Sequence, residues 1–270
     1  MSFFTSLSGM RNAENDLRVI SNNIANAETA GFKKSNAQFA DLVATGGSTD
    51  PRRTPGIGAT VSSVSQDFGL GQLEQTGRVL DIAINGDGFI ATANPVSGDI
   101  TFTRNGNLQL VATGELQDAF GELVQAFPVD ANGNPTSTTP GNVVVPITNG
   151  AGFALSSVSI NSQGILSATY ADGSNEAVAQ LALASFASNG GLRPIGQTKW
   201  ENTAASGQPN YGQPGIGNYG GIFSGALERS NVDLAEEMVS LLTAQRNFQA
   251  NARAIDTATA ISQTVLNLQR

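Results

Sequence analysis

The C-terminal residues 230–270 constrain the fold most strongly. They contain no Pro or Gly, and their apolar positions recur at steps of four and three, which places them on one face of a helix. Ser230 and Asp233 have the spacing of a capping box and mark its start. A helix of about 35 residues is roughly 50 Å long, so its stripe requires a partner of similar length. The stripe consists of Leu234, Met238, Leu241, Gln245, Phe248, Ala252 and Ile255.

Residues 2–28 supply a matching pattern at the other end of the chain. The alternative is a terminal helix that packs only on its own globular domain. Because both ends are amphipathic, we favour two long helices, residues 1–34 and 226–270, that pair as a coiled coil. Gly31 lies beyond the last periodic position and predicts the end of the first helix. The apolar face of the first helix is formed by Phe3, Leu7, Met10, Ala13, Leu17, Ile20, Ile24 and Ala27.

Between the helices the pattern changes to that of turns and short strands. Residues 35–71 have the composition of a linker, and a β domain is expected over residues 72–225. Period-two alternation predicts hairpins around Asn85-Gly86 and Asn105-Gly106, and later ones at 161–164 and 172–174. Gly114 and Gly121 are expected to separate further short strands.

Two later stretches are less regular. Residues 128–154 are rich in turn residues, with one strand predicted over residues 143–145. Residues 187–225 are expected to run as an extended ribbon over the β domain, held by Trp200, Tyr211 and Tyr219. The predicted class is therefore α+β, with terminal helices around a central, mostly antiparallel β domain.

Composition removes several classes of function. The chain has no His and no Cys, which excludes His- or Cys-based nucleophiles, metal sites built on those ligands, and disulfides. A formal charge of −8 argues against nucleic-acid binding. No apolar run approaches the ~18 residues of a membrane span, and the start lacks a secretory signal pattern. We therefore expect neither nucleic acid nor membrane insertion.

The remaining candidates for chemistry fail on spacing. Loops at 81–92 and 130–135 lack the ligand pattern of a calcium-binding EF-hand. Lys34 and Ser35 are adjacent without a supporting motif for a nucleophile and its base. A carboxylate pair among Glu115, Asp118 and Glu122 is more simply explained by strand edges and turns. We expect a structural or interaction protein with no catalytic residue, metal or cofactor.

Several long motifs resemble those of bacterial flagellar rod and hook proteins. The N-terminal signature is Ser-Asn-Asn-Ile-Ala-Asn at 21–26, followed by Thr-Ala-Gly-Phe-Lys-Lys at 29–34. The similarity continues in residues 80–89, 103–106, 205–207, 225–233 and 245–251. It covers both ends and most of the middle of the chain.

Within that family the motifs look most like the hook protein. These motifs lie at residues 8–10, 39–41, 183–187 and 225–228. The chain is shorter than a typical hook protein, because only residues 128–157 stand where such proteins carry a large outer domain. We expect a hook subunit, the universal joint between rod and filament. A distal rod subunit of the basal body is the alternative, and a secreted β-rich adhesin is a remote one.

The resemblance implies a hollow helical homopolymer, with terminal helices inside and β domains outside. It implies export through the flagellar type III apparatus to an extracellular hook or a periplasm-spanning rod. The implied partners are rod proteins, hook–filament junction proteins and the hook cap. The residues expected to form the polymerisation seam are Phe3, Leu7, Met10, Leu17, Ile24, Leu234, Met238, Leu241, Phe248 and Ile255.

Overall fold

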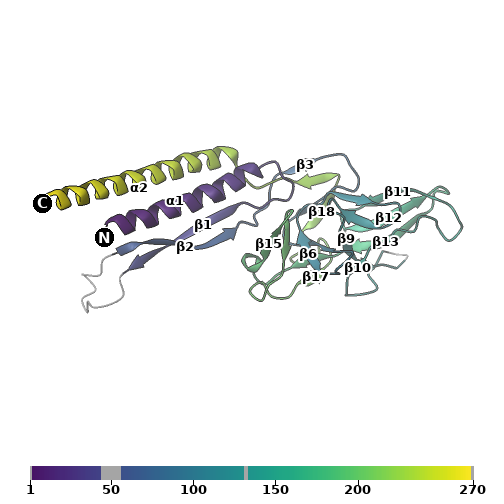
Figure 1. Cartoon of the computed structure of the whole chain (residues 1–270). Coiled ribbons are helices and arrows are strands. Elements are labelled where there is room, and N and C mark those ends of the chain that lie inside the picture. The colour runs from purple at the N-terminus through teal and green to yellow at the C-terminus, as the bar shows by residue number, and fades with distance from the viewer. Residues whose placement is uncertain (1, 44–55, 131–132, 269–270) are drawn as a thin grey trace. The chain divides into compact units, whose positions relative to one another are not determined.

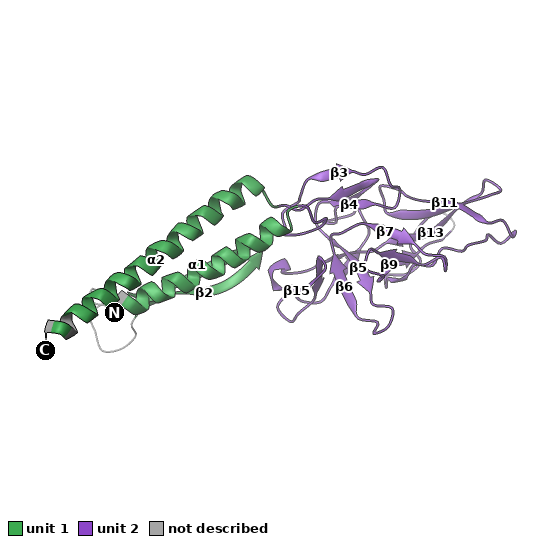
Figure 2. Ribbon diagram, turned by 45° about the horizontal axis from the view of Figure 1, so that its top comes forward, with its two compact units in different colours: residues 1–27, 34–67, 232–270 green, residues 28–33, 68–231 purple. Residues whose placement is uncertain are grey.

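A computed structural model describes residues 2–43, 56–130 and 133–268 of the chain (Figure 1). The chain forms two compact units that are interleaved in sequence (Figure 2). Unit 1 comprises residues 1–27, 34–67 and 232–270, and unit 2 comprises residues 28–33 and 68–231. The chain therefore passes from unit 1 into unit 2 for the short segment 28–33 and then returns to unit 1.

Unit 1 contains helices α1 (Ser2–Ala25) and α2 (Leu234–Leu268) and an antiparallel ribbon of β1 (Ser35–Val43) and β2 (Gly56–Gln66). Helix α1 lies between α2 and the ribbon (Figure 1). Gly9 of α1 fits closely against α2, because a Cβ there would lie 2.7 Å from the Asn251 side chain. The two helices pair side by side as expected, while coiled-coil geometry remains a prediction.

The helix boundaries differ from those expected. Helix α1 ends at Ala25, well before residue 34, and α2 begins at Leu234. The N-cap of α2 is Asp233, whose Oδ1 accepts hydrogen bonds from the N–H groups of Ala235 at 2.8 Å and Glu236 at 3.2 Å. Ser230 is therefore not the cap.

The prediction of a linker over residues 35–71 is wrong for β1 and β2. These strands pair from Ser35↔Gln66 to Val43↔Gly56. Most of the side chains in β1 and β2 are exposed. Apolar and polar residues therefore alternate only weakly along these two stretches of the sequence. A ribbon that rests one face on a helix needs few apolar residues, and this explains why composition suggested a linker. The turn residues at 45–51 and 54–56 lie wholly or mostly outside the described residues.

Unit 2 is built on a sheet of thirteen strands whose main path runs β11-β12-β13-β9-β5-β6-β16-β15. Two smaller pairs, β18–β4 and β19–β3, complete it, and every strand pairing in the described residues is antiparallel. The strands are β3 (Leu73–Gln75), β4 (Ile82–Asn85), β5 (Phe89–Ala93), β6 (Ile100–Thr103), β7 (Leu108–Leu110), β8 (Leu116–Asp118), β9 (Leu123–Pro128), β10 (Gly141–Asn142), β11 (Leu155–Ile160), β12 (Ile165–Tyr170), β13 (Asn175–Leu181), β14 (Leu183–Ser185), β15 (Arg193–Gly196), β16 (Lys199–Glu201), β17 (Asn210–Gly212), β18 (Gly221–Ser224) and β19 (Ala226–Glu228).

Strand β5 separates two hydrophobic cores. All five of its residues are buried, and successive side chains point to opposite faces of the sheet. Ile90 joins a large aliphatic cluster that also contains Ile82 and Leu166. Phe89 joins an aromatic cluster with Trp200. A strand buried on both faces reads as a continuous apolar run, as residues 89–91 do.

The two hairpins expected around Asn-Gly turns are wrong. Strand β4 pairs with β18 and β5 pairs with β6, while β7 pairs with β8. Gly106 instead allows two backbones to meet, since a Cβ on it would lie 1.8 Å from the carbonyl oxygen of Ile82. The N–H of Ile82 donates to Gly106 O at 3.0 Å. Gly106 is therefore required for the close approach of two backbones. It does not form a turn between two strands that pair with each other.

The other expected hairpins are confirmed. Residues 161–164 connect β11 to β12, and residues 172–174 connect β12 to β13. Gly114 and Gly121 lie in the turns that connect β7, β8 and β9.

Part of the segment 133–154 packs on the β sheet of unit 2. Val143 and Val145 are buried, Val144 forms an isolated bridge with Glu115, and the short strand β10 precedes them. Residues 187–225 contain the 3-10 turn η2 (Asn189–Gly191) and β15 to β18, so they are integrated strands and not only a covering ribbon. No described helix is long and apolar enough to cross a membrane.

Gly106→Ala should destabilise unit 2 by about 1–3 kcal/mol, because the methyl group would overlap the backbone of β4. Gly141→Ala is the matched control, since nothing lies within 4 Å of its Cβ position. The control should change stability by less than about 1 kcal/mol. Urea unfolding of the full chain measures both variants, and equal stabilities would refute the close approach.

Candidate functional site: buried polar anchors and an exposed helix face

The side chain of Glu228, at the end of β19, is fully buried in unit 2 and surrounded by donors. Its Oε1 lies 2.5 Å from Lys33 Nζ and accepts a hydrogen bond from the N–H of Gly71 at 2.9 Å. Its Oε2 lies 3.5 Å from Arg104 Nη1. Buried charges are stable only when paired and hydrogen-bonded, and these contacts meet that requirement. We call this group of residues the Glu228 anchor.

The Glu228 anchor joins three stretches of unit 2. Each of them lies next to a point where the chain passes between unit 2 and unit 1. Lys33 ends segment 28–33, and its Nζ also donates to Gly69 O at 2.7 Å, next to the start of segment 68–231. Glu228 lies near the end of that segment, and its backbone O accepts a hydrogen bond from Gly31 N at 2.8 Å. One carboxylate thus holds together the stretches where the chain enters and leaves unit 2.

Two glycines make this convergence possible. Gly31 has a φ of 71°, and a Cβ on it would lie 2.5 Å from the backbone N of Asn105. A Cβ on Gly71 would lie 2.0 Å from Arg229 O. A side chain at either position would force the backbone segments apart.

The Glu228 anchor contains two cations and one anion. Burial lowers the pKa of the Arg104 guanidinium from its ordinary value, and the negative charges of Glu228 and Asp87 oppose that shift. The guanidinium also lies 5.1 Å from the centre of the Phe89 ring, which attracts cations through its face. The charge of Arg104 is therefore stabilised both by Glu228 and by the aromatic core.

A second buried group, the Asn23 anchor, lies in unit 1. Asn23, near the end of α1, donates to Ser35 O and accepts from Ser35 N, both at 2.9 Å. Its Nδ2 also lies 3.2 Å from Glu237 Oε2 on α2. Lys34 Nζ lies 3.3 Å from Glu236 and 3.7 Å from Glu237. The Asn23 anchor fixes the start of β1 against both helices.

A third polar group underlies one edge of the unit 2 sheet. Lys199 Nζ lies 2.7 Å from Asp118 Oδ2 and 2.8 Å from Glu122 Oε2. Glu122 also accepts hydrogen bonds from the hydroxyls of Thr92 and Thr101. Burial raises the pKa of Glu122, but the hydrogen bonds from Lys199 and both threonines outweigh it and leave the pKa below its ordinary value.

The residues weighed earlier for catalysis serve these structural contacts. Asp118 and Glu122 do come together, but both form ion pairs with Lys199. Ser35 and Lys34 belong to the Asn23 anchor, and Glu115 accepts a hydrogen bond from Thr113. Among the described residues, no three Asp, Glu, His or Cys side chains gather as a metal site would require.

The predicted seam residues fall into two groups. Phe3, Leu234 and Met238 are exposed, with Met238 at 55%. Val239 and Leu242 of α2 lie outside the predicted seam, although they are 64% and 55% exposed on the same helix. The half-buried members are Leu7, Met10, Leu17, Ile24, Leu241, Phe248 and Ile255.

The residues of the two anchors have no predicted role in the sequence beyond their place in the family motifs. These residues are Asn23, Lys33, Arg104 and Glu228. A charged or amide residue inside a long motif indicates a specific contact. The sequence does not show which residue forms the other half of that contact. Lys33 and Glu228, for example, are separated by 195 positions.

Glu228→Gln should destabilise unit 2 by about 3–5 kcal/mol, because it removes the buried carboxylate charge that pairs with Lys33 and Arg104. The control is Glu201→Gln, which breaks the exposed pair with Arg193, where the side chains are 42% and 64% exposed. That change should cost less than about 1 kcal/mol. Urea unfolding monitored by Trp200 fluorescence measures both, and similar losses would contradict the role of the anchor.

Comparison with protein families gives matches at both ends and in the middle of the chain. Residues 4–33 match the model "Flagella basal body rod protein". Residues 83–168 match "Flagellar hook protein FlgE/F/G D1 domain". Residues 224–268 match "Flagellar basal body rod FlgEFG protein C-terminal".

Full-length relatives agree with these matches. The flagellar basal-body rod protein FlgG of Bacillus subtilis is 36% identical over 282 aligned positions, covering 100% of this chain and 99% of the relative. FlgG of Borreliella burgdorferi is 32% identical, covering 100% and 98%. The flagellar hook protein FlgE of Salmonella typhimurium is 26% identical over 411 positions, covering all of both chains. The chain therefore belongs to the flagellar rod and hook protein family.

Proposed function

We propose that this chain is a distal rod subunit of the flagellar basal body. The observation that carries the proposal is the end-to-end alignment with FlgG relatives over 282 positions at up to 36% identity. The hook alignment extends over 411 positions for a chain of 270 residues. A long stretch of the hook relative therefore has no counterpart here.

The distal rod subunit was the alternative expectation from the sequence, and we favour it here over the hook subunit. The motifs that suggested a hook protein occur in a family whose rod and hook members both match this chain. We propose that residues 128–157 stand in place of an outer domain. Two described contacts tie this segment to the β sheet of unit 2: Val143 N donates to Val124 O, and Tyr170 OH donates to Pro146 O. The hook reading remains the second candidate because FlgE also aligns with the whole chain.

The proposed activity is mechanical. Subunits polymerise into a hollow tube by head-to-tail contacts, which generate an open helical assembly. The two units of each subunit are joined covalently at residues 27–28, 33–34, 67–68 and 231–232. The Glu228 anchor and the Asn23 anchor hold the segments next to these connections, so we propose that they limit how far each segment yields under load.

The polymerisation seam is proposed to use the exposed part of the helices. Leu234, Met238 and Leu242 follow one another at steps of four on α2, with Val239 beside them. Burying each of these side chains on a neighbouring copy would contribute about 1.5–3 kcal/mol. The half-buried positions Leu241, Phe248 and Ile255 are proposed to stabilise unit 1 first and the polymer second.

The partners follow from this placement. We propose other copies of this chain, the adjoining rod and hook proteins, and the type III export apparatus that would deliver the subunit. The proposed location is the periplasm-spanning part of the flagellum.

A strain that lacks this gene tests the proposal by electron microscopy of its isolated basal bodies. A distal rod subunit predicts rods that stop short and carry no hook, because later subunits have nothing to add to. Complementation with the unaltered gene is the control and should restore full structures. Complete rods that lack only the hook would instead make this chain the hook subunit.

A further inference from the structure

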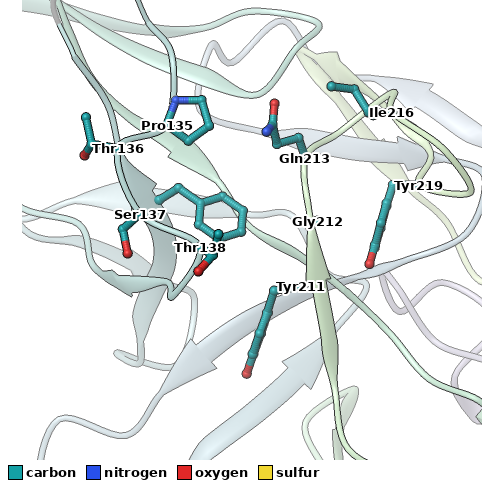
Figure 3. Close-up of a pocket in the computed structure, with 10 residues that line it drawn as sticks. Pro135, Thr136, Ser137, Thr138, Tyr211, Gly212, Gln213, Ile216 and Tyr219 are labelled. Atoms are coloured by element: carbon teal, nitrogen blue, oxygen red, sulfur yellow. The ribbon is translucent and has the colours of Figure 1, made fainter.

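A groove in unit 2 has the lining of a binding site for a small, uncharged ligand. Its volume is about 460 Å³, a size typical of small-molecule sites in proteins (Figure 3). One wall runs from Pro135 to Thr138, and the opposite wall runs from Tyr211 to Tyr219. None of the described lining residues is Asp, Glu, Lys or Arg. A charged ligand would therefore find no counter-charge in the walls, whereas a neutral ligand needs none.

The wall with the tyrosines is held in shape by its own contacts. Tyr219 OH donates to Asn210 O at 3.2 Å and accepts from Ser185 Oγ at 3.3 Å. The Tyr219 ring covers Gly212, where a Cβ would come within 2.1 Å of the ring. Burial raises the pKa of the Tyr211 phenol, so this side chain stays uncharged at neutral pH. Because the wall is ordered before binding, little freedom is lost when a ligand lies on it.

Hydrogen bonds also fix the opposite wall. The N–H and the hydroxyl of Thr136 both donate to Pro128 O, at 2.8 Å and 3.1 Å. The N–H of Thr139 donates to Ser137 Oγ at 3.1 Å. The hydroxyls of Thr136 and Ser137 are therefore used within the wall itself, and they hold Thr138 in position between them and Thr139.

Two polar side chains in the lining have no hydrogen-bond partner among the described residues. They are Thr138 of one wall and Gln213 of the other. A hydroxyl and a carboxamide can each both donate and accept hydrogen bonds. The hydroxyl groups of a saccharide can do the same, so a saccharide is able to bond to both side chains whichever way they are oriented.

The aromatic rings favour a ligand that has a flat, C–H-rich face. The face of an aromatic ring carries partial negative charge. The C–H groups on one face of a pyranose ring carry partial positive charge, so such a ring packs on Tyr211 or Tyr219 while its edge carries the hydroxyls. Ile216, which is 59% exposed in the same wall, offers an apolar contact for the methyl group of an N-acetylated sugar.

We propose that this groove binds a neutral saccharide, with its ring on the tyrosine faces and its polar edge on Thr138 and Gln213. A proline-rich peptide also packs on tyrosine rings, but its prolines have no N–H to donate to Gln213 Oε1. Saccharide binding does not depend on the proposed function. The proposed periplasm-spanning location makes the glycan strands of the cell wall one source of the sugar, and a soluble oligosaccharide is the other.

Titration of the full chain with the trimer of N-acetylglucosamine, followed by two-dimensional NMR, tests the site. The backbone amide resonances of Thr138 and Gly212 should shift and reach saturation at millimolar sugar, while that of Ala91 in the buried strand β5 should stay in place. Sorbitol has hydroxyls but no ring, so it should cause no such shift. Unshifted Thr138 and Gly212 resonances in the presence of the trimer would overturn the proposal.

Two variants locate the binding within the groove. Gln213→Ala and Thr138→Val should each weaken binding of the trimer about fivefold, because each removes hydrogen bonds to the sugar. Neither change removes a hydrogen bond within the described chain, so the unfolding midpoint should stay the same. The matched control is Gln117→Ala, since Gln117 of β8 is also half-buried in unit 2 but lies outside the groove lining. Unchanged affinity in both groove variants, or an equal loss in the control, would contradict the proposed site.

Co-sedimentation of the purified chain with isolated cell-wall sacculi identifies the source of the sugar. Sedimentation that excess trimer reverses would support the proposal with a cell-wall glycan as ligand, and trimer binding without sedimentation would support it with a soluble oligosaccharide. A proline-rich peptide that shifts the Thr138 and Gly212 resonances when the trimer does not would overturn it. All these measurements use the purified chain, so their failure leaves the rod assignment standing, because that assignment is tested by the deletion strain.

Discussion

The buried carboxylate of Glu228 is the contact on which the rest of unit 2 depends. It brings together Lys33 from the segment after α1, Gly71 from the segment before β3, and Arg104 from the turn after β6. It offsets part of the free-energy cost of burying these two charges and this N–H, since an unpaired charge or N–H in the interior is costly. In unit 1 the amide of Asn23 plays a comparable part by bonding both to Ser35 and to Glu237. Hydrophobic burial gives each unit its cohesion, and these polar groups determine which segments meet.

Periodicity in the sequence correctly predicted those helices, strands and turns that depend on residues close together in the chain. The two helices, the meander of β11, β12 and β13, and the turns at Gly114 and Gly121 follow from local spacing. It failed where a contact between distant residues decides the structure. The Asn105-Gly106 pair looks like a hairpin turn, but the glycine is required by Ile82, which lies on another strand. The same holds for the Glu228 anchor, whose members are recognisable only once the chain has folded.

The helix faces illustrate a second limit. A stripe at steps of four and three cannot distinguish contacts within a subunit from contacts between subunits, because both require apolar side chains. In the structure Phe248 is half-buried, whereas Met238 is exposed. The family resemblance in the sequence likewise indicated a rod or hook protein, while the distal rod assignment that we propose rests on the length of the aligned relatives.

Hydrogen exchange at the backbone N–H of Gly71 tests the central claim most directly. This N–H donates to Glu228 Oε1, so its exchange reports whether the carboxylate stays in place. The account predicts exchange as slow as that of Ala91 in the buried strand β5, because both would open only when unit 2 unfolds. Exchange of the Gly71 N–H within seconds, while that of Ala91 stays protected, would show that the Glu228 anchor opens locally and would contradict the account.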